Sequence, residues 1–96
     1  MIRVQGFDWD NGNTQKAVKH GLSIEQIEQF FQSNPYVYSD QKNSKKESRF
    51  LAFDKVGVKI LFVAFTLRAI DGVLKIRVIS ARYAHKKEWN KFYGQI

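Results

Sequence analysis

The chain has 96 residues, of which 16 are Lys or Arg and 9 are Asp or Glu, so its net charge is +7. It has no cysteine and two histidines, which excludes a disulfide framework and leaves too few ligands for a zinc site. The longest apolar run, 60–65, is too short to span a membrane, and no apolar signal-peptide core follows the first residues. We therefore expect one cytoplasmic domain, 1–96, with no metal, no cofactor and no membrane contact. Its charge favours nucleic acid, an acidic protein or an anionic surface as partner.

The first third of the chain predicts a strand and then a helix. Residues 2–9 mix apolar and polar side chains, as a short strand does. Asp10 can cap a helix that runs through 16–20, and Gly21 is suited to end it, because glycine accepts the positive φ angle found after many helices. Residues 11–13 are poor helix formers, so the first turn should be weak.

A second helix has clearer signals. Ser23 and Gln26 fit a capping box, in which each side chain accepts a hydrogen bond from the backbone N–H of the other residue. The helix should end at Asn34, because a residue before proline avoids helical backbone angles. We expect the two helices to pack as a hairpin on a sheet.

The second half of the chain predicts antiparallel strands joined by short turns. Residues 36–38 predict a short strand or an extended loop, and the polar segment 41–46 predicts a loop. Residues 58–68 are apolar on both faces, so this strand should be central and covered on both sides. The main strands are expected at 47–53, 58–68 and 74–79, with turns at 54–57 and 69–72.

Helical spacing appears after Ser80. His85, Glu88 and Trp89 fall on one side of a predicted C-terminal helix, and basic residues fall on the other. The whole pattern predicts a small α+β domain: an N-terminal strand and two helices, an antiparallel β-meander of about three to four strands, and the C-terminal helix. The candidate RNA contacts on this helix are Lys86, Lys87 and Lys91.

One carboxylate and several arginines are predicted to lie close together. Glu47 and Arg49 are two residues apart on a strand and so share a face. Hairpin pairing places the strands of Arg68, Arg77 and Arg82 side by side. A metal-free ribonuclease uses such a set: a base for the 2′-hydroxyl proton, cations for the phosphate and an acid for the leaving oxygen. The alternative is that Glu47 only neutralises an arginine in a cross-strand pair.

Two arginines of the last strand do not fit regular alternation. Arg77 and Arg82 are an odd number of residues apart, so a regular strand points them to opposite faces. They converge only if the strand twists, bulges or ends near Ser80. We expect both side chains to be exposed, so that replacing either with alanine leaves the fold intact.

A second cluster lies at the end of the first predicted helix. His20 is placed in the last helical turn, where the helix dipole favours the protonated imidazole, and Lys19 lies beside it. His20 is therefore a candidate general acid or phosphate contact, and Lys19 a candidate RNA contact. The alternative is a simple interaction with the end of the helix.

Several segments in order resemble one family. The most characteristic are Arg-Val-Ile-Ser-Ala-Arg at 77–82 and Lys-His-Gly at 19–21. Over nearly its whole length the chain resembles the BrnT family of toxins from bacterial type II toxin–antitoxin systems. The matching motif positions are Lys19, His20, Glu47, Arg49, Arg68, Arg77, Ser80, Arg82 and Glu88.

The resemblance implies a RelE-like fold and a ribonuclease that cleaves RNA and inhibits translation. It also implies a hetero-oligomer with a BrnA-like antitoxin, whose ribbon-helix-helix domain would make all contacts with operator DNA. One departure is His85, which stands where the family usually has a threonine helix cap, and histidine is the weaker cap.

In the leading hypothesis Glu47 is the base, the arginines hold the phosphate, and His20 or Lys19 is the acid. A 2′,3′-cyclic phosphate would then be the product. A non-catalytic basic module that binds RNA or an acidic protein is the alternative. A metabolic enzyme acting on an anionic small molecule has less support, because the chain has no glycine-rich phosphate loop.

Overall fold

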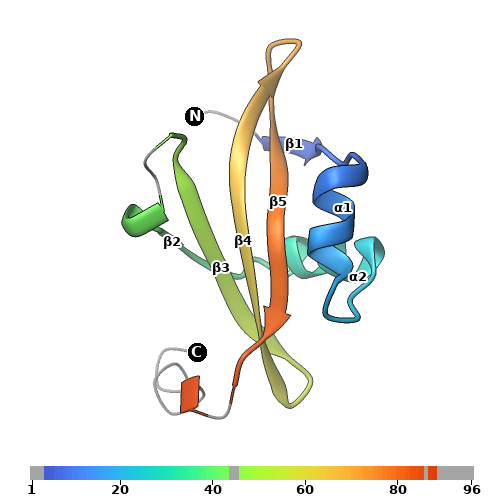
Figure 1. The fold of residues 1–96 in the computed structure, drawn as a ribbon, viewed down its shortest axis with the longest axis vertical. Helices are drawn as coiled ribbons and strands as arrows, with labels where there is room; N and C mark the ends of the chain where they lie inside the picture. Colours follow the sequence, from blue (N-terminus) through green and yellow to red (C-terminus); the bar gives the residue numbers. More distant parts are fainter. Residues whose placement is uncertain (1–3, 44–45, 86, 89–96) are drawn as a thin grey trace.

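The computed structural model describes residues 4–43, 46–85 and 87–88, which form a small α+β domain with two helices and a five-stranded mixed sheet (Figure 1). β2 to β5 are successive antiparallel neighbours, and β1 joins the far side of β5 in parallel. The sequence did not predict this parallel pairing, because the partner strand lies at the other end of the chain. The strands are β1 (Val4–Phe7), β2 (Tyr36–Ser39), β3 (Arg49–Val56), β4 (Lys59–Ile70) and β5 (Val73–Tyr83).

The two helices are α1 (Asn11–Val18) and α2 (Ile24–Gln32). The predicted capping box of α2 is confirmed: Ser23 Oγ accepts from the Gln26 N–H at 3.1 Å, and Gln26 Oε1 accepts from the Ser23 N–H at 2.8 Å. The first turn of α1, expected to be weak, is closed by a second capping box between Asp10 and Asn13. In the segment expected to be a loop, a 3-10 helix, η1, spans Gln41–Asn43.

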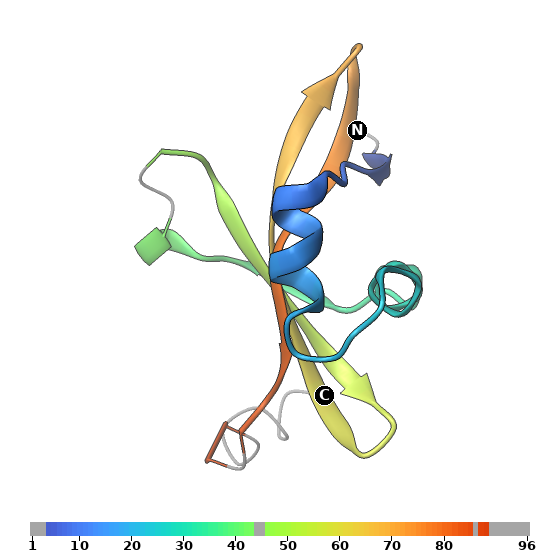
Figure 2. The same cartoon turned by 45° about the vertical axis from the view of Figure 1, so that its right-hand side comes forward.

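The prediction of a central strand with two apolar faces is confirmed by β4. On one face its buried residues Leu61, Val63 and Phe65 pack with side chains from both helices, which lie on the same side of the sheet (Figure 2). On the other face Ile60 and Phe62 form a second buried cluster with Phe53. The helix-free side therefore carries its own small apolar cluster beside polar residues.

The ends of β3 differ from the prediction. The strand begins at Arg49 rather than at residue 47, and it continues to Val56, which pairs with Lys59 across a two-residue turn. Glu47 thus precedes the strand, so strand alternation is the wrong reason for placing it beside Arg49. Of the predicted C-terminal helix, His85, Lys87 and Glu88 are described: Lys87 and Glu88 are helical and His85 precedes them, while its other residues lie outside the described part.

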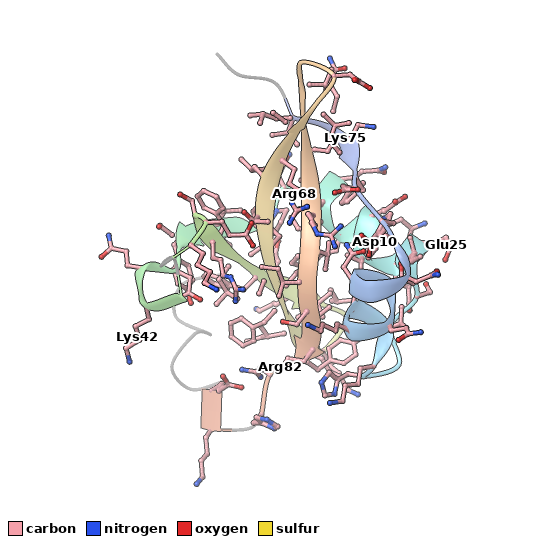
Figure 3. The ribbon with its side chains drawn as sticks, turned by 45° about the horizontal axis from the view of Figure 1, so that its top comes forward. Asp10, Glu25, Lys42, Arg68, Lys75 and Arg82 are labelled. Atoms are coloured by element: carbon pink, nitrogen blue, oxygen red, sulfur yellow. The ribbon has the colours of Figure 1, made fainter. Side chains whose placement is uncertain are left out.

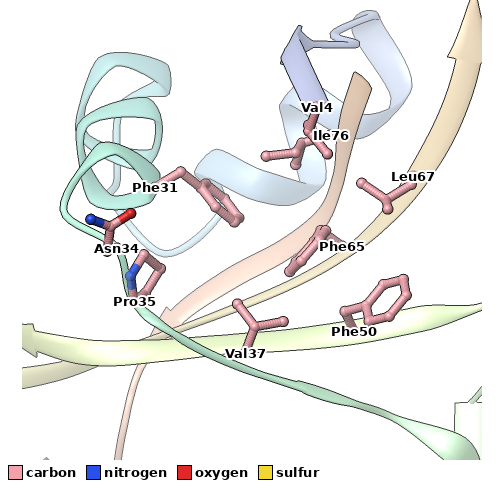
Figure 4. A pocket seen from close by; sticks show the side chains of 9 residues that line it. All are labelled: Val4, Phe31, Asn34, Pro35, Val37, Phe50, Phe65, Leu67 and Ile76. Atoms are coloured by element: carbon pink, nitrogen blue, oxygen red, sulfur yellow. The ribbon is translucent and has the colours of Figure 1, made fainter. Parts of the chain in front are cut away.

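An apolar hollow of about 350 Å³ lies on the helix side, between α2, β1 and the sheet (Figure 4). Phe31 of α2 contacts Phe65 of β4 edge to face, with ring centroids 5.1 Å apart, on one side of this hollow. None of the described residues that line it has a titratable side chain. The hollow is therefore separate in position and in chemistry from the polar groups of the opposite face.

Candidate active site

An irregularity in β5 decides which face its arginines share. Ala64 and Phe65 are adjacent in β4, but their partners in β5 are Ser80 and Val78. Ile79 is the extra residue, so β5 has a β-bulge at this position. The bulge lies next to Ser80, where the sequence required an irregularity.

The bulge brings Arg77 and Arg82 to one face. Arg77 pairs with Thr66 and Arg82 with Phe62. These two partners are four residues apart in β4, and residues an even number apart on a strand share a face. Figure 3 shows Arg68 and Arg82 well apart along the β4–β5 ribbon. The arginines thus follow one side of the ribbon, although they do not all meet.

Arg49 and Arg77 flank Thr66 on this face, since Thr66 pairs with Arg49 of β3 and with Arg77 of β5. The Thr66 side chain is buried, and its hydroxyl donates to the Ser48 carbonyl at 2.6 Å. This bond fixes the segment just before β3, which carries Glu47. The structure therefore supplies a reason for the position of Glu47 that strand periodicity does not contain.

Glu47, Arg49 and Arg77 line one polar hollow of about 240 Å³, together with Lys16 from α1. Arg68 reaches the cluster through Glu47, with 3.9 Å between its Nη2 atom and Glu47 Oε2. This ion pair is loose and largely exposed, at 49% for the Arg68 side chain and 39% for that of Glu47. Four of the predicted catalytic residues are thus together: Glu47, Arg49, Arg68 and Arg77.

Arg77 is held by two carboxylates. Its Nη1 donates to Asp8 Oδ2 at 3.2 Å, and its Nη2 lies 2.9 Å from Asp10 Oδ2. Burial disfavours the charged guanidinium, but the Asp10 hydrogen bond and the charges of both carboxylates outweigh it, so the pKa of Arg77 is raised. The Arg77 side chain is only 17% exposed, which contradicts the expectation of an exposed arginine.

The carboxylate of Asp10 is fixed from two sides. A hydrogen bond from the Asn13 backbone, and then the Arg77 guanidinium, lower the pKa of Asp10. Asn13 itself is buried, and its Nδ2 donates to the Asp8 carbonyl at 2.9 Å and to the Val78 carbonyl at 3.1 Å. The start of α1 is therefore attached to β5 beside the polar hollow, and this attachment positions Lys16 there.

Arg82 lies in a different environment. It forms a two-bond ion pair with Glu88, with Nη1–Oε1 at 2.7 Å and Nη2–Oε2 at 2.9 Å, and its guanidinium lies 5.2 Å from the centre of the Phe62 ring. Both residues line a second hollow, of about 210 Å³. The hydrogen bond from Arg82 is the main cause that lowers the pKa of Glu88 to about 2. Arg82 is thus neutralised locally and does not line the first hollow.

The structure does not bring His20 and Lys19 into either hollow. α1 ends at Val18 with Lys19 as its C-cap, so His20 follows the helix rather than lying in its last turn. Both residues are exposed, and neither is among the described residues that line the polar hollow, although Lys16, which does line it, lies in the last turn of α1. Lys87 is exposed beside Glu88, whereas Lys86 and Lys91 lie outside the described residues.

Sequence reasoning missed Lys16 and Asn13. The signal for Asn13 was present, because Asn three residues after an Asp cap can return a hydrogen bond to the cap, as Gln does after Ser23. For Lys16 the sequence offered only its place on the same predicted helix as Asn13, which does not show that its side chain lines the hollow. Within the described part of the chain, no group of three His, Cys, Asp or Glu side chains is arranged to hold a metal ion, and no helix is long and apolar enough to cross a membrane.

These features define a small basic α+β domain with a cluster of arginines and one carboxylate on the sheet face that carries Thr66, where α1 meets β5. Residues 9–88 match the family described as ribonuclease toxin, BrnT, of type II toxin-antitoxin systems. The chain therefore belongs to this family, which confirms the resemblance found in the sequence. No curated protein matches the chain significantly. Membership of the family implies an RNA substrate and an antitoxin partner.

Proposed function

We propose that this toxin is a metal-independent endoribonuclease that cleaves RNA by attack of a 2′-hydroxyl on the adjacent phosphate. The observation that carries the proposal is one hollow lined by Glu47, Arg49, Arg77 and Lys16. It combines a carboxylate, which can accept a proton, with fixed cations, which stabilise the charge that builds on the phosphate. Because the cations belong to the protein, the reaction as proposed uses no metal ion.

Glu47 takes the proton of the 2′-hydroxyl, and O2′ forms a bond to phosphorus. The bond from phosphorus to O5′ breaks, and Lys16 gives the leaving oxygen its proton. The products are a 2′,3′-cyclic phosphate and a free 5′-hydroxyl. Lys16 takes the role of acid in this proposal, because it lines the hollow and His20 does not. Arg49 contacts the phosphate, Arg77 fixes the wall of the hollow, and Arg68 orients Glu47.

The experiment is cleavage of RNA by the purified chain in EDTA, with identification of the new ends. Glu47→Gln should lower the rate by roughly 10²–10⁴-fold, the usual contribution of a general base. Glu25→Gln makes the same change of charge on an exposed residue of α2 and serves as the control. Activity that is lost in EDTA and restored by magnesium would refute the metal-independent reaction, and products ending in a 3′-hydroxyl would refute attack by the 2′-hydroxyl.

A second candidate is a basic module that binds RNA without cleaving it. The Glu47–Arg68 ion pair and the two carboxylates on Arg77 favour it, because they are also what a purely structural charge network contains. This candidate predicts that Glu47→Gln leaves RNA affinity unchanged and that RNA stays intact with the wild-type chain, both free and on ribosomes.

We further propose that cleavage inhibits translation and that the antitoxin is BrnA-like, with a ribbon-helix-helix domain that makes the operator contacts of a hetero-oligomer. The net charge of +7 suits an acidic antitoxin segment lying over the arginine face, where it would cover Arg77, Arg82 or the predicted helix from His85. Hydrogen exchange of the co-expressed complex tests this placement. Protection confined to α2 on the opposite side would refute direct coverage of the site.

A further inference from the structure

The second hollow is formed by small side chains between larger ones. Ala64 and Ser80 are paired neighbours in β4 and β5, and Leu51 pairs with Ala64 from β3. Tyr38 of β2 pairs with Leu51 and continues the same row. The row therefore has short side chains on β4 and β5 and larger ones on β2 and β3, and the hollow of about 210 Å³ is lined by all four residues.

The walls of this hollow differ in chemistry. On one side Tyr38 presents an aromatic ring that is fixed edge to face against Phe53, with 5.7 Å between ring centroids, while the residue stays 42% exposed. On the other side lie the Ser80 hydroxyl and the Arg82–Glu88 ion pair. An aromatic surface opposite hydrogen-bonding groups is how proteins hold single unpaired bases.

The ion pair makes this hollow unsuitable as a second phosphate site. Glu88 cancels the charge of Arg82, and a phosphate brought here would lie against the Glu88 carboxylate. Glu88 Oε1 accepts from both Arg82 and the His85 N–H, whereas Oε2 accepts one bond, from Arg82, and keeps a second lone pair, so Oε2 can still accept from an amino group. The volume lies below the roughly 300–1,000 Å³ of sites for larger ligands, which suits one planar base.

The hollow also lies at a suitable distance from the proposed phosphate site. Ala64 is two residues before Thr66 in β4, on the same face, which corresponds to about 7 Å along the strand. Thr66 lies between Arg49 and Arg77. A strand of RNA with its phosphate at these arginines therefore has a neighbouring base within reach of Tyr38.

We infer that the hollow of Tyr38, Ser80, Arg82 and Glu88 is a nucleobase subsite next to the scissile phosphate, and that it selects a base with an exocyclic amino group over uracil. The inference rests on the proposed function, because it places the base relative to the phosphate cleaved there. Tyr38 stacks on the base and Glu88 accepts from its amino group. This subsite gives the enzyme its sequence preference.

The test compares two tyrosines of β2. Tyr36 and Tyr38 both contact Phe53 and are similarly exposed, at 49% and 42%, but only Tyr38 lines the hollow. Cut sites of the wild-type chain, Tyr38→Ala, Tyr38→Phe and Tyr36→Ala are mapped by sequencing on an RNA pool of random sequence. Tyr38→Ala should lose the base preference at one position beside the cut, whereas Tyr38→Phe and Tyr36→Ala should keep it. Glu88→Gln should admit uracil at that position.

A measurement of RNA binding tests the base subsite independently of RNA cleavage, so it shows which of the two proposals has failed. A short RNA with 2-aminopurine, an amino-bearing fluorescent base, reports stacking whether or not RNA is cleaved. Tyr38→Ala should weaken its binding roughly 10-fold and abolish the quenching, while Tyr36→Ala should change neither. Quenching that depends on Tyr38 without any cleavage would support the subsite and refute the ribonuclease. Cleavage with the same preference in Tyr38→Ala as in the wild-type chain would refute the subsite and leave the ribonuclease standing.

Discussion

Arg82 and Glu88 are joined by two parallel hydrogen bonds of 2.7 and 2.9 Å, which connect the end of β5 to residue 88. Glu88 Oε1 also accepts from the His85 N–H at 2.9 Å, so one carboxylate binds both a guanidinium and the backbone three residues before it. This is half of a capping box, with His85 at the cap position. His85 replaces the threonine that the family usually has at this cap, and the hydrogen bond from the cap N–H to Glu88 is kept.

The first prediction is that acid lowers the free energy of unfolding, because protonation of Glu88 removes its ion pair with Arg82. Its pKa is about 2 in the folded chain, below its ordinary value of 4.5, so its contribution is complete above about pH 4.5 and is lost as the pH falls toward 2. Glu88→Gln cannot titrate. Urea unfolding at several pH values should show the wild-type chain more stable than Glu88→Gln at pH 6, with the difference shrinking below pH 4.5. A difference that stays constant down to pH 2 would contradict this assignment.

The second prediction separates two arginines of the cluster by stability. Arg77→Ala should cost about 2 kcal/mol, because it leaves Asp8 and Asp10 facing each other without the partly buried guanidinium between them. Arg68→Ala should change the free energy of unfolding by less than about 0.5 kcal/mol, because its ion pair is long and exposed. Chemical denaturation measures both. Equal losses of unfolding free energy in the two variants would show that Asp8 and Asp10 do not need Arg77 to offset their charges.

The third prediction concerns Asn13. Asn13→Ala should lower stability by about 2–3 kcal/mol, because it removes one of the two hydrogen bonds of the α1 capping box and both bonds from the Asn13 side chain to a partly buried and a buried backbone carbonyl. Ser23→Ala is the matched control, since it removes only the exposed cap of α2 and should cost about 1 kcal/mol. Thermal and urea unfolding of both variants measure the two losses of stability. RNA cleavage should fall in Asn13→Ala alone, because only α1 carries Lys16 to the polar hollow.

The fourth prediction concerns salt. If Lys16 contacts a phosphate, Lys16→Ala should weaken RNA binding and reduce the slope of log affinity against log salt by about 0.7. Lys55→Ala removes the same charge at the far end of β3, away from the hollow, and should leave the slope nearly unchanged. Titration of a labelled single-stranded RNA at several salt concentrations measures the slope. His20→Ala provides a further comparison, since a loss of cleavage in it greater than in Lys16→Ala would return the role of acid to His20.

Local patterns predicted the two helices α1 and α2, the central strand and the family. The capping box of Ser23 and Gln26 and the two apolar faces of β4 depend on residues close in sequence, and both are confirmed. The parallel pairing of β1 with β5 was not predictable in this way, because no local pattern states which distant strand is the partner.

The candidate site was predictable in composition but not in arrangement. Glu47 and three arginines were chosen by residue type and lie together, yet the hydrogen bond from Thr66 to Ser48 that fixes their loop could not be inferred. The bulge at Ile79 lies next to Ser80, where the sequence analysis placed the irregularity that Arg77 and Arg82 need in order to share a face. The partial burial of Arg77 was missed because its two carboxylates come from the opposite end of the chain.

The contacts of Arg77 with Asp8 and Asp10 also bear on synthesis of the toxin. They join positions 69 and 67 residues apart, and they fix the wall of the polar hollow that contains Glu47 and Arg49. A nascent chain that has not yet exposed residue 77 lacks this wall, however well its first two helices have formed. Contacts of such long separation also form late in folding, because the intervening loop must close first. The arrangement of β1 and β5 thus delays assembly of the complete cluster until β5 has been synthesised.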